Sequence, residues 1–447
     1  MKDIDIVHIK RLVGEANVAE PTQAKKYAKD YYWFSPVLAM SMKGLKADIV
    51  VHVRELDSLK ALVAYCVERA IPITPRGAGT GNYGQSMPLN GGVLLDFQTM
   101  NQLLEIDPGR GQARCAPGLR CQRIEEAARE AGWEMMMYPS TWVRATLGGF
   151  LAGGSAGIGS VRHGVISDGE MVRSLKVLTA EQEPTIRELE GEACADYLHA
   201  YGINGLIVEA VINLAPKLPW DQVLFSGNDL ETVFGFAVEL GSQDRFDLRL
   251  LNFQQWPIPS FFKPIRSKLK DGEHIVQIEV ASSQLPALRA MAEAHGLTER
   301  IHYPHLEPRR SPMLSDFVQN HSTLWAKKSD THYTYIAVKL DLMNWRRDLA
   351  ALAAAPGHPM HLRCDFNRSK KSLKAAAGPI FYAGLPEEVM EKTRYLKEQG
   401  LFFYDVHSPY IDRDGMAEQN AAKVRMKPQV DPQGILNAGR IRGKDDF

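Results

Sequence analysis

The sequence has 447 residues, of which 53 are Lys or Arg and 53 are Asp or Glu, so the formal net charge is zero. This length allows two or three domains, and the balanced charge argues against a nucleic acid or an anionic membrane as a partner. The five cysteines form no C-x-x-C pair, which indicates the reduced thiols of a cytoplasmic protein and neither a disulfide nor a metal motif.

Strand and helix patterns alternate from about residue 47 to residue 216. Short β-branched runs predict strands, and an apolar stripe at helical spacing predicts the first helix. In chain order the expected elements are a strand at Ile49–Val53, a helix at Asp57–Ala70, strands at Ile71–Thr74 and Val93–Asp96, a helix at Arg120–Glu130, and strands at Ser174–Thr179 and Leu206–Leu214. After Pro216 the sequence has aromatic and helical segments without glycine clusters, and it becomes turn-rich again at DPQGILNAGR, residues 431–440.

Neither the N-terminus nor the uncharged stretch in the interior of the first domain predicts a membrane segment. The N-terminus, MKDIDIVHIKR, lacks the apolar core of a signal peptide. The uncharged stretch Ala145–Val161 contains the small-xxx-small pattern of membrane helices, but it is rich in glycine and shorter than the roughly 20 apolar residues of a span. We expect a buried loop with a short helix there, and no transmembrane segment.

A loop at Thr74–Pro88, TPRGAGTGNYGQSMP, holds four glycines within eight residues. From Gly79 it matches G-x-G-x-x-G, but Pro88 and further glycines follow, so the helix that a dinucleotide-binding motif requires cannot begin. It also approaches a P-loop, yet Gln85 stands in place of the lysine. Two interpretations remain, a nest of backbone N–H groups around a pyrophosphate and a glycine-rich hairpin.

Three more glycine clusters follow in order, YPSTWVRATLGGFLAGGSAG at 138–157, HGVISDG at 163–169 and YGINGLIVEAV at 201–211. With PITPRGAGTG and the closing DPQGILNAGR, this series resembles the FAD-linked oxidases of the vanillyl-alcohol oxidase / p-cresol methylhydroxylase (PCMH) type. YPSTWVRATLGG is similar to their Pro-Asp-Pro-Ala-Ser-x4-Thr-Ile-Gly-Gly, and the tail to their Asp-Pro-x-Gly-Ile-Leu-Asn-Pro-Gly-Lys. The N-terminal half looks nearest to the glycolate oxidase / D-lactate dehydrogenase-like branch.

The resemblance implies an α+β protein with a PCMH-type FAD-binding domain of two α/β subdomains and an α+β cap domain. We expect the FAD-binding domain at 1–216, the cap at 217–398, and a C-terminal segment at 399–447 that returns to the FAD domain. The implied cofactor is FAD. The resemblance implies that the pyrophosphate is surrounded by Arg76, Gly77, Ala78, Gly79, Thr80, Gly81 and Asn82, with Gln85 beside them. It places Ser140, Thr141, Thr146, Gly148 and Gly149 at the flavin ring or ribityl chain, and Gly153 and Gly154 where the cofactor approaches closely. Ile207 and Val208 are implied to contact the adenine half, and Asn437 to lie near the flavin ring.

Departures from the family pattern bear on flavin attachment and on metal binding. Members that tether flavin through this loop have histidine where Thr80 stands, and those with a second cysteinyl link have cysteine near Trp142. The resemblance therefore implies non-covalent FAD, and it leaves a tether from the cap open. The metal motif of the hydroxy-acid branch, His-x-Gly-Asp-Gly-Asn-x-His, is reduced to GHPMHLRCDFN at 357–367, so we expect no metal site and a surface or capping role for His358 and His361.

Oxidation of an alcohol by a flavin needs a group that takes the O–H proton, and histidine suits that task near neutral pH. The stretch FFYDVHSPY, residues 402–410, lies where hydroxy-acid members have Glu-His-Gly. We expect His407 to be the base, with Asp405 and Tyr410 beside it, and strand alternation would place Asp405 and His407 on one face. The candidates for binding a carboxylate are Arg249, Arg309, Arg310 and Arg363.

The predicted function is FAD-dependent oxidation of an alcohol-type carbon, with a 2-hydroxy acid as the first substrate class. A phenolic or other alcohol is the alternative, because the metal motif is missing and the cap is aromatic. A rival of another class is a flavin-binding electron-transfer subunit whose partner carries the substrate chemistry. The expected partners are the small-molecule substrate and an electron acceptor, which is oxygen, a quinone or a protein. A homodimer is one assembly that we consider for this chain.

Overall fold

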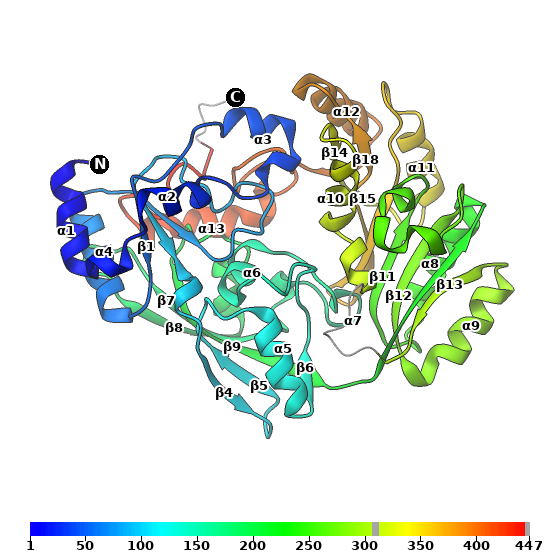
Figure 1. Ribbon diagram of the computed structural model, residues 1–447, viewed down its shortest axis with the longest axis horizontal. Helices are drawn as coiled ribbons and strands as arrows, with labels where there is room; N and C mark the ends of the chain where they lie inside the picture. Colours follow the sequence, from blue (N-terminus) through cyan, green and yellow to red (C-terminus); the bar gives the residue numbers. More distant parts are fainter. Residues whose placement is uncertain (306–312, 443–447) are drawn as a thin grey trace.

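The computed structural model describes residues 1–305 and 313–442 and forms two lobes (Figure 1). The first lobe contains the chain from the N-terminus to strand β9 (Leu206–Pro216) together with helix α13 (Ala417–Val430). The second lobe, called the cap below, runs from β10 (Trp220–Gly227) to β19 (Phe402–Tyr404). The chain thus enters the cap once, leaves it once, and ends against the lobe in which it began.

The first sheet of the first lobe is parallel, with the order β1 (Ile49–His52), β3 (Val93–Asp96), β2 (Ile73–Arg76). Helix α4 (Leu56–Glu68) covers it with the apolar stripe read from the sequence, in which Leu59, Leu62 and Val63 are buried. Helix α1 (Asp3–Val13), which the sequence reading did not predict, packs against α4. Because parallel strands have buried faces, these strands are short and almost continuously apolar.

The C-terminal segment closes this sheet. Leu436 forms a parallel bridge to Ile73, and the Asn437 N–H donates to the Ile73 carbonyl oxygen at 2.6 Å. Arg440 is fully buried and donates to the carbonyl oxygens of Gly84 and Met87. The tail therefore supports the glycine-rich loop from behind.

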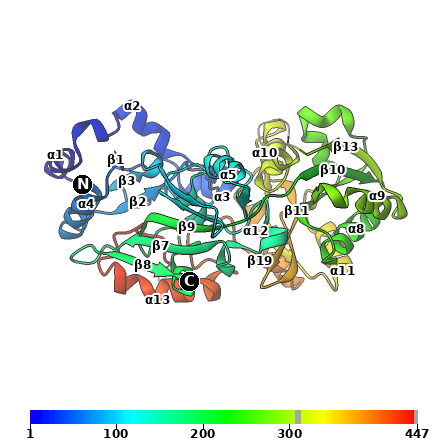
Figure 2. The same cartoon turned by 90° about the horizontal axis from the view of Figure 1, so that it is seen from below.

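The second sheet of the first lobe is antiparallel. Its order is β4 (Leu103–Asp107), β5 (Gln112–Cys115), β9, β7 (Val172–Leu178), β8 (Ile186–Glu190), and β6 (Trp133–Met135) also pairs with β9. Helix α5 (Cys121–Glu130) packs on β6, and Figure 2 shows α13 beneath β7 and β8. The uncharged stretch 145–161 forms only two short helices, α6 (Leu147–Gly153) and α7 (Ser160–His163).

The cap is built on an eight-stranded antiparallel sheet, in agreement with the α+β cap that the resemblance implies, although none of its strands was predicted individually. Its order is β13 (Thr298–Tyr303), β10, β12 (His274–Ala281), β11 (Leu248–Gln254), β16 (Arg363–Ser369), β17 (Ser372–Ala377), β15 (Ala337–Leu340), β19. One face is apolar and is covered by helices that include α8 (Leu230–Ser242), α9 (Leu285–Ala294), α11 (Trp345–Ala353) and α12 (Pro386–Glu398). The opposite face looks toward the first lobe, and it carries polar residues.

Candidate active site

A cavity of about 280 Å³ lies where the two lobes meet. Its first-lobe walls come from the glycine-rich loop, from the segments around 139–156, and from residues 197–207. Helix α10 (Asn320–Ser329) closes it from the cap, and Tyr31 and Phe34 close it from the N-terminal segment. The cavity thus has a glycine-lined part in the first lobe and a cap end lined by side chains.

The glycine-rich loop presents bare backbone to the cavity. The N–H groups of residues 78–82 have no hydrogen-bond acceptor within the described part of the chain, although all five residues line the cavity. Gly79 has φ +64°, a conformation that glycine adopts without steric cost. A run of unpartnered N–H groups of this kind forms an anion-binding nest, and the loop therefore fits the pyrophosphate interpretation better than a self-satisfied hairpin.

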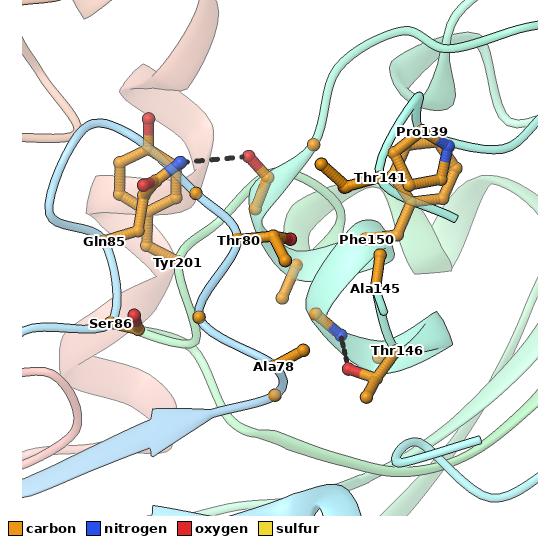
Figure 3. Close-up of a pocket in the computed structure, with 18 of the residues that line it drawn as sticks. Ala78, Thr80, Gln85, Ser86, Pro139, Thr141, Ala145, Thr146, Phe150 and Tyr201 are labelled. Carbon is orange, nitrogen blue, oxygen red and sulfur yellow. Dashed lines mark hydrogen bonds between the residues drawn. The ribbon is translucent and has the colours of Figure 1, made fainter. Parts of the chain in front are cut away.

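The opposite wall of this part is the start of helix α6. Thr146 caps that helix, because its Oγ1 accepts a hydrogen bond from the Gly149 N–H at 3.3 Å. An ideal Cβ at position 77 would overlap Thr146 Oγ1 and would lie 3.5 Å from the Gly149 Cα. In Figure 3 the loop with Ala78 and Thr80 faces the segment with Ala145 and Thr146. Glycine at position 77 thus lets the loop and the helix start form one narrow cradle.

Charged side chains lie behind the loop rather than in it. Arg76 is buried, and its guanidinium donates to the Lys29 carbonyl oxygen at 2.7 Å and to Ser86 Oγ at 3.4 Å. Ser86 in turn donates to Asp30, and burial raises the pKa of the Asp30 carboxyl to about 6. The side chains of Arg76 and Arg440 bring positive charge close to the buried Asp30 carboxyl, beneath a loop whose residues line the cavity.

Most residues expected at the cofactor line this cavity. They are Arg76 to Asn82, Gln85, Ser140, Thr141, Thr146, Gly148, Gly149, Gly153, Gly154 and Ile207. Val208 instead belongs to the core of the first sheet. Asn437 lies behind the loop, where its Nδ2 donates to the carbonyl oxygens of Gln85 at 2.9 Å and of Tyr201 at 2.6 Å.

Two histidines, His199 and His321, lie in the cavity wall and were not predicted from the sequence as site residues. His199 has φ +50°, and its Nδ1 is hydrogen-bonded to the Gly154 carbonyl oxygen at 2.7 Å. His321 lies on α10, and its Nδ1 is hydrogen-bonded to the Ser315 carbonyl oxygen at 3.3 Å. Neither histidine stands in a motif. Only the position of His199 just before the YGINGLIVEAV cluster could have suggested it.

Buried amides on the cap sheet hold the segment that leads to α10. Gln222 Oε1 accepts from the Leu314 N–H at 2.8 Å, and Gln254 Nε2 donates to the Phe317 carbonyl oxygen at 2.5 Å. All these groups are buried, and such groups rarely stay unpaired. Side chains on the polar face of the sheet thereby form hydrogen bonds with the backbone groups of Leu314 and Phe317 and hold this irregular segment in place.

This segment delivers Gln319 and Asn320 to the cavity. Gln319 has φ +52°, which is uncommon for a residue other than glycine. Its N–H donates to Asp365 Oδ1 at 3.3 Å, and its Oε1 accepts from the Ser140 N–H at 3.3 Å. Strained conformations of this kind persist where the surrounding contacts determine them, and they cluster at functional sites.

Arg363 lies directly behind Asn320. It is buried, and its Nη1 donates to Asn320 Oδ1 at 3.3 Å. Its guanidinium carbon is 5.4 Å from the centre of the Tyr335 ring, and its Nε is buried without a partner in the described part of the chain. No carboxylate of the described residues lies within ion-pair distance of it. Arg363 therefore brings positive charge close to the cap end, where it also acts on the buried Asp365 carboxyl and opposes the rise that burial causes in the pKa of that group.

The other arginines proposed for a carboxylate are placed differently. Arg249 is committed to buried ion pairs, with its Nε 2.7 Å from Glu279 Oε2. Arg309 and Arg310 lie outside the described residues. His358 and His361 also do not join a metal-binding cluster, since no group of three or more His, Cys, Asp or Glu side chains in residues 1–305 and 313–442 could hold an ion.

The expected catalytic base, His407, and its neighbours Asp405 and Tyr410 come after strand β19 in the chain and are not part of it. Because the strand ends at Tyr404, its alternation does not extend to them, and Asp405 accepts from the backbone N–H of His407 at 2.9 Å instead of facing the imidazole. His407 Nδ1 is hydrogen-bonded to Ser35 Oγ at 2.7 Å, and its Nε2 is buried without a partner among the described residues. Neither His407, Asp405 nor Tyr410 lines the cavity.

His407 is connected to the cavity through Tyr335. The two rings are 6.4 Å apart, and the Tyr335 hydroxyl accepts from Asn82 Nδ2 at 2.6 Å. Burial lowers the pKa of His407 to about 4, so the imidazole is neutral near pH 7. A neutral imidazole has one nitrogen that is able to accept a proton, and a hydrogen bond to the Tyr335 backbone opposes the fall in the pKa of His407 that burial causes.

Comparison with known proteins gives the class of this one. Residues 47–185 match the family described as "FAD binding domain". The glycolate oxidase subunit GlcD of Bacillus subtilis is 31% identical over 436 residues, covering 89% of both chains. The D-lactate dehydrogenase of Archaeoglobus fulgidus is 27% identical over 177 residues, which cover 38% of this chain and 39% of that protein. The chain is an FAD-linked oxidoreductase, and FAD is its cofactor.

The fold agrees with this class. The crystal structure of p-cresol methylhydroxylase with substrate bound superposes with a TM-score of 0.72 at 16% identity, over 100% of this chain and 99% of that one. The chain belongs to the FAD-linked oxidases with a PCMH-type FAD-binding domain, as the resemblance of its glycine motifs predicted. No helix in the described part is long and apolar enough to cross a membrane.

Proposed function

We propose that the FAD pyrophosphate is bound by the N–H groups of residues 78–82, opposite the start of α6. The unpartnered N–H groups and the contact between Gly77 and Thr146 support this placement. Ser140, Thr141, Gly153 and Gly154 then lie at the flavin and ribityl part, because they line the cavity between the loop and the cap. The FAD is non-covalent, since Thr80 occupies the position of the tethering histidine.

The substrate is a 2-hydroxy acid that the enzyme oxidises at C2. The observation that carries this proposal is Arg363, a buried guanidinium with no ion-pair partner among the described residues, held against Asn320 of the cavity wall. The Asn320 amide contacts the substrate carboxylate and Arg363 supplies the compensating charge. The names of the relatives, a glycolate oxidase subunit and a D-lactate dehydrogenase, agree with this substrate class.

When bound, FAD would supply the acceptor for the hydride that leaves C2. The chain must bind the carboxylate, hold the carbon in place and take the hydroxyl proton. His407 is the proton acceptor, because its Nε2 is unpartnered in the described part and its Nδ1 is fixed by Ser35. Asp405 and Tyr410 support the turn that carries it. His321 is the second candidate, because it lines the cap end of the cavity.

Anaerobic stopped-flow reduction of the bound flavin tests the proposal. The panel contains glycolate, D-lactate, a phenolic alcohol and a sugar, and we expect reduction by the 2-hydroxy acids. Arg363→Gln should lower the bimolecular rate constant by about 10- to 100-fold, the usual range for a hydrogen bond to a charged group. Arg368→Gln, on the same strand but paired with Asp244, is the matched control.

The panel also decides between the alternatives. Reduction by the phenolic alcohol alone would replace the substrate class and keep the oxidase function. If none of the compounds reduces the flavin while a copurifying protein does, the chain is an electron-transfer subunit. That second function is favoured by one observation, the description of the Bacillus relative as a subunit.

A further inference from the structure

We propose that the cap end of the cavity is a subsite for an apolar side chain, so that the substrate is a 2-hydroxy monocarboxylate with a branched aliphatic or aryl group. This inference rests on the proposed function. It distinguishes the substrate from glycolate, which has no side chain, and from a 2-hydroxy dicarboxylate, which would carry a second charge there.

The walls of this subsite, which we define as Tyr31, Phe34 and Leu324, consist of two aromatic rings and one aliphatic side chain, with the Tyr31 hydroxyl as their one polar group. All three line the cavity, and none belongs to the glycine-lined part. The rings of Tyr31 and Phe34 meet edge to face at 5.7 Å, and helix α10, which carries Leu324, contacts the 3-10 helix Tyr32–Phe34. Walls of this kind favour a substrate group that water does not solvate.

The walls are held in place by both lobes. The Tyr31 N–H donates to the Gly81 carbonyl oxygen at 3.0 Å, which ties the N-terminal segment to the glycine-rich loop. The Phe34 carbonyl oxygen accepts from Thr334 Oγ1 at 2.8 Å, which ties the same segment to the cap. The subsite is therefore preformed, and a ligand need not order it.

The proposed function assigns the positive charge of Arg363 to the first carboxylate, and no cation of the described residues lines the subsite itself. Arg76, at the glycine-rich loop, is the single Lys or Arg among the described residues that line the cavity. Lys327 lies one turn beyond Leu324, but its Nζ donates to the carbonyl oxygens of Thr331 at 2.7 Å and Tyr333 at 2.5 Å. Burial lowers the pKa of His321, so it is neutral near pH 7. A second carboxylate would thus be buried without compensation.

Helix geometry sets the distance from the carboxylate site to this subsite. Asn320 and Leu324 are four residues apart on α10 and therefore lie on one face, about one turn or ~5.4 Å apart. A substrate with its carboxylate at Asn320 extends a side chain of about three or four carbons to reach Leu324. 4-Methylpentanoate, which lacks the hydroxyl and cannot be oxidised at C2, has this length.

The experiment is a titration of the FAD-loaded protein with inert carboxylates, followed by the change in the flavin absorption spectrum. We expect 4-methylpentanoate to bind at least 10-fold more tightly than acetate, because each buried methylene contributes about 4-fold. Glutarate should bind no more tightly than acetate. Equal affinities for acetate and 4-methylpentanoate, or a preference for glutarate, would overturn the subsite.

Variants assign the effect to Leu324. Leu324→Ala should lower the ratio of the affinity for 4-methylpentanoate to the affinity for acetate by about 5-fold or more. Leu324→Lys should make glutarate bind more tightly than 4-methylpentanoate. Leu373→Ala removes a half-buried leucine of the cap that does not line the cavity, and it should leave the ratio unchanged. A ratio that Leu324→Ala does not alter would also overturn the subsite.

The titration is independent of turnover. If no 2-hydroxy acid reduces the flavin, the proposed function fails, and the inert carboxylates still report whether the subsite is apolar. If glycolate and 2-hydroxy-4-methylpentanoate reduce the flavin with equal bimolecular rate constants, the function stands and the subsite is wrong.

Discussion

Gly77 lies so close to Thr146 that a Cβ at position 77 would overlap the Thr146 hydroxyl. That hydroxyl caps α6 through the Gly149 N–H. The loop that follows β2 and helix α6, which lies within the second glycine cluster, are therefore in contact where the Thr146 hydroxyl meets the side-chain-free Gly77. Any group larger than hydrogen at position 77 must displace the cap or open the cradle.

Gly77→Ala should therefore reduce both FAD binding and stability. We expect the purified variant to contain much less FAD than the wild type, and the free energy of unfolding of the apoprotein to fall by about 1 kcal/mol, the usual cost of losing an N-cap. Flavin content and urea denaturation measure the two effects. Gly235→Ala is the control, because its Cβ would meet nothing nearer than Trp345 at 3.8 Å. Full flavin occupancy in Gly77→Ala would move the pyrophosphate away from this loop.

The FAD should be released by acid. Thr80 lines the cavity where a tethering histidine would stand, and all five cysteines are free, buried, and absent from the cavity wall. Precipitation with trichloroacetic acid should leave the yellow colour in the supernatant, where chromatography identifies FAD. Colour that remains with the pellet would contradict non-covalent binding, and peptide mapping would then locate the tether.

Arg249 should be the most sensitive charged residue at the contact between the lobes. Its guanidinium lies 2.7 Å from Glu279 of the cap and 3.7 Å from Glu125 of the first lobe, and all three side chains are buried. Arg249→Met leaves buried carboxylates without this cation, so the free energy of unfolding should fall by about 3–5 kcal/mol. Arg346→Met breaks an exposed pair with Glu231 and should cost at most about 1 kcal/mol. Similar losses in the two variants would refute this ranking.

Stability should fall as the pH is lowered from about 6.5 towards 4. Burial lowers the pKa of His199 to about 3 and that of His407 to about 4, whereas an unfolded histidine titrates near 6.5. Between about pH 4 and 6.5 the unfolded state binds more protons than the folded state, so the free energy of unfolding rises with pH. The stabilisation that comes from these two neutral histidines is fully present above about pH 6.5.

Urea unfolding at pH 7.5 and pH 5.0 measures this effect. His199→Gln should reduce the loss between the two pH values by about 2 kcal/mol, which is 1.5 pH units for one group. His8→Gln, at an exposed position, is the control. An unchanged loss in His199→Gln would mean that this histidine is not buried in its neutral form.

The glycine-lined part of the site could be predicted from the sequence because its requirements are local. Residues 76–82 and 146–154 are short runs in which the lack of a side chain is itself the function, so the composition of the run reveals it. Even so, Asn437 lies behind the loop rather than in the wall, since its side chain bonds the loop carbonyl of Gln85. A motif gives proximity to the cofactor but not the direction of each side chain.

The cap end could not be predicted because its residues are placed by long-range contacts. Phe34 is fixed by Thr334, 300 residues later, and Asn320 is delivered by a segment that Gln222 and Gln254 hold through buried amides. None of these pairs has a spacing that a sequence pattern can show. The cap strands do alternate, as in Val276, Gln277, Ile278, Glu279 and Val280 of β12, but the sequence does not show that the polar face is buried as well.

The proton acceptor is the remaining choice, and two histidines compete for it. His407 has the unpartnered Nε2 and a ring 6.4 Å from that of Tyr335, whereas His321 lines the cavity itself. If His407 takes the proton, His407→Ala should retain FAD, because no part of this side chain lies in the cradle. Its rate of flavin reduction by a 2-hydroxy acid should fall by about 10²–10⁴-fold, the usual contribution of general acid–base catalysis.

Anaerobic stopped-flow across pH separates the two histidines. His321→Ala should slow reduction by less than about 10-fold, an effect on positioning, and it should keep the pH profile of the wild type. His407→Ala should lose the limb of the profile that reports deprotonation of the base, and Asp405→Asn should have a smaller effect because its carboxylate bonds only the backbone N–H of His407. If His407→Ala reduces within about 3-fold of the wild type while His321→Ala loses the pH limb, the base is His321, and His407 serves only to anchor Ser35 beside the cavity.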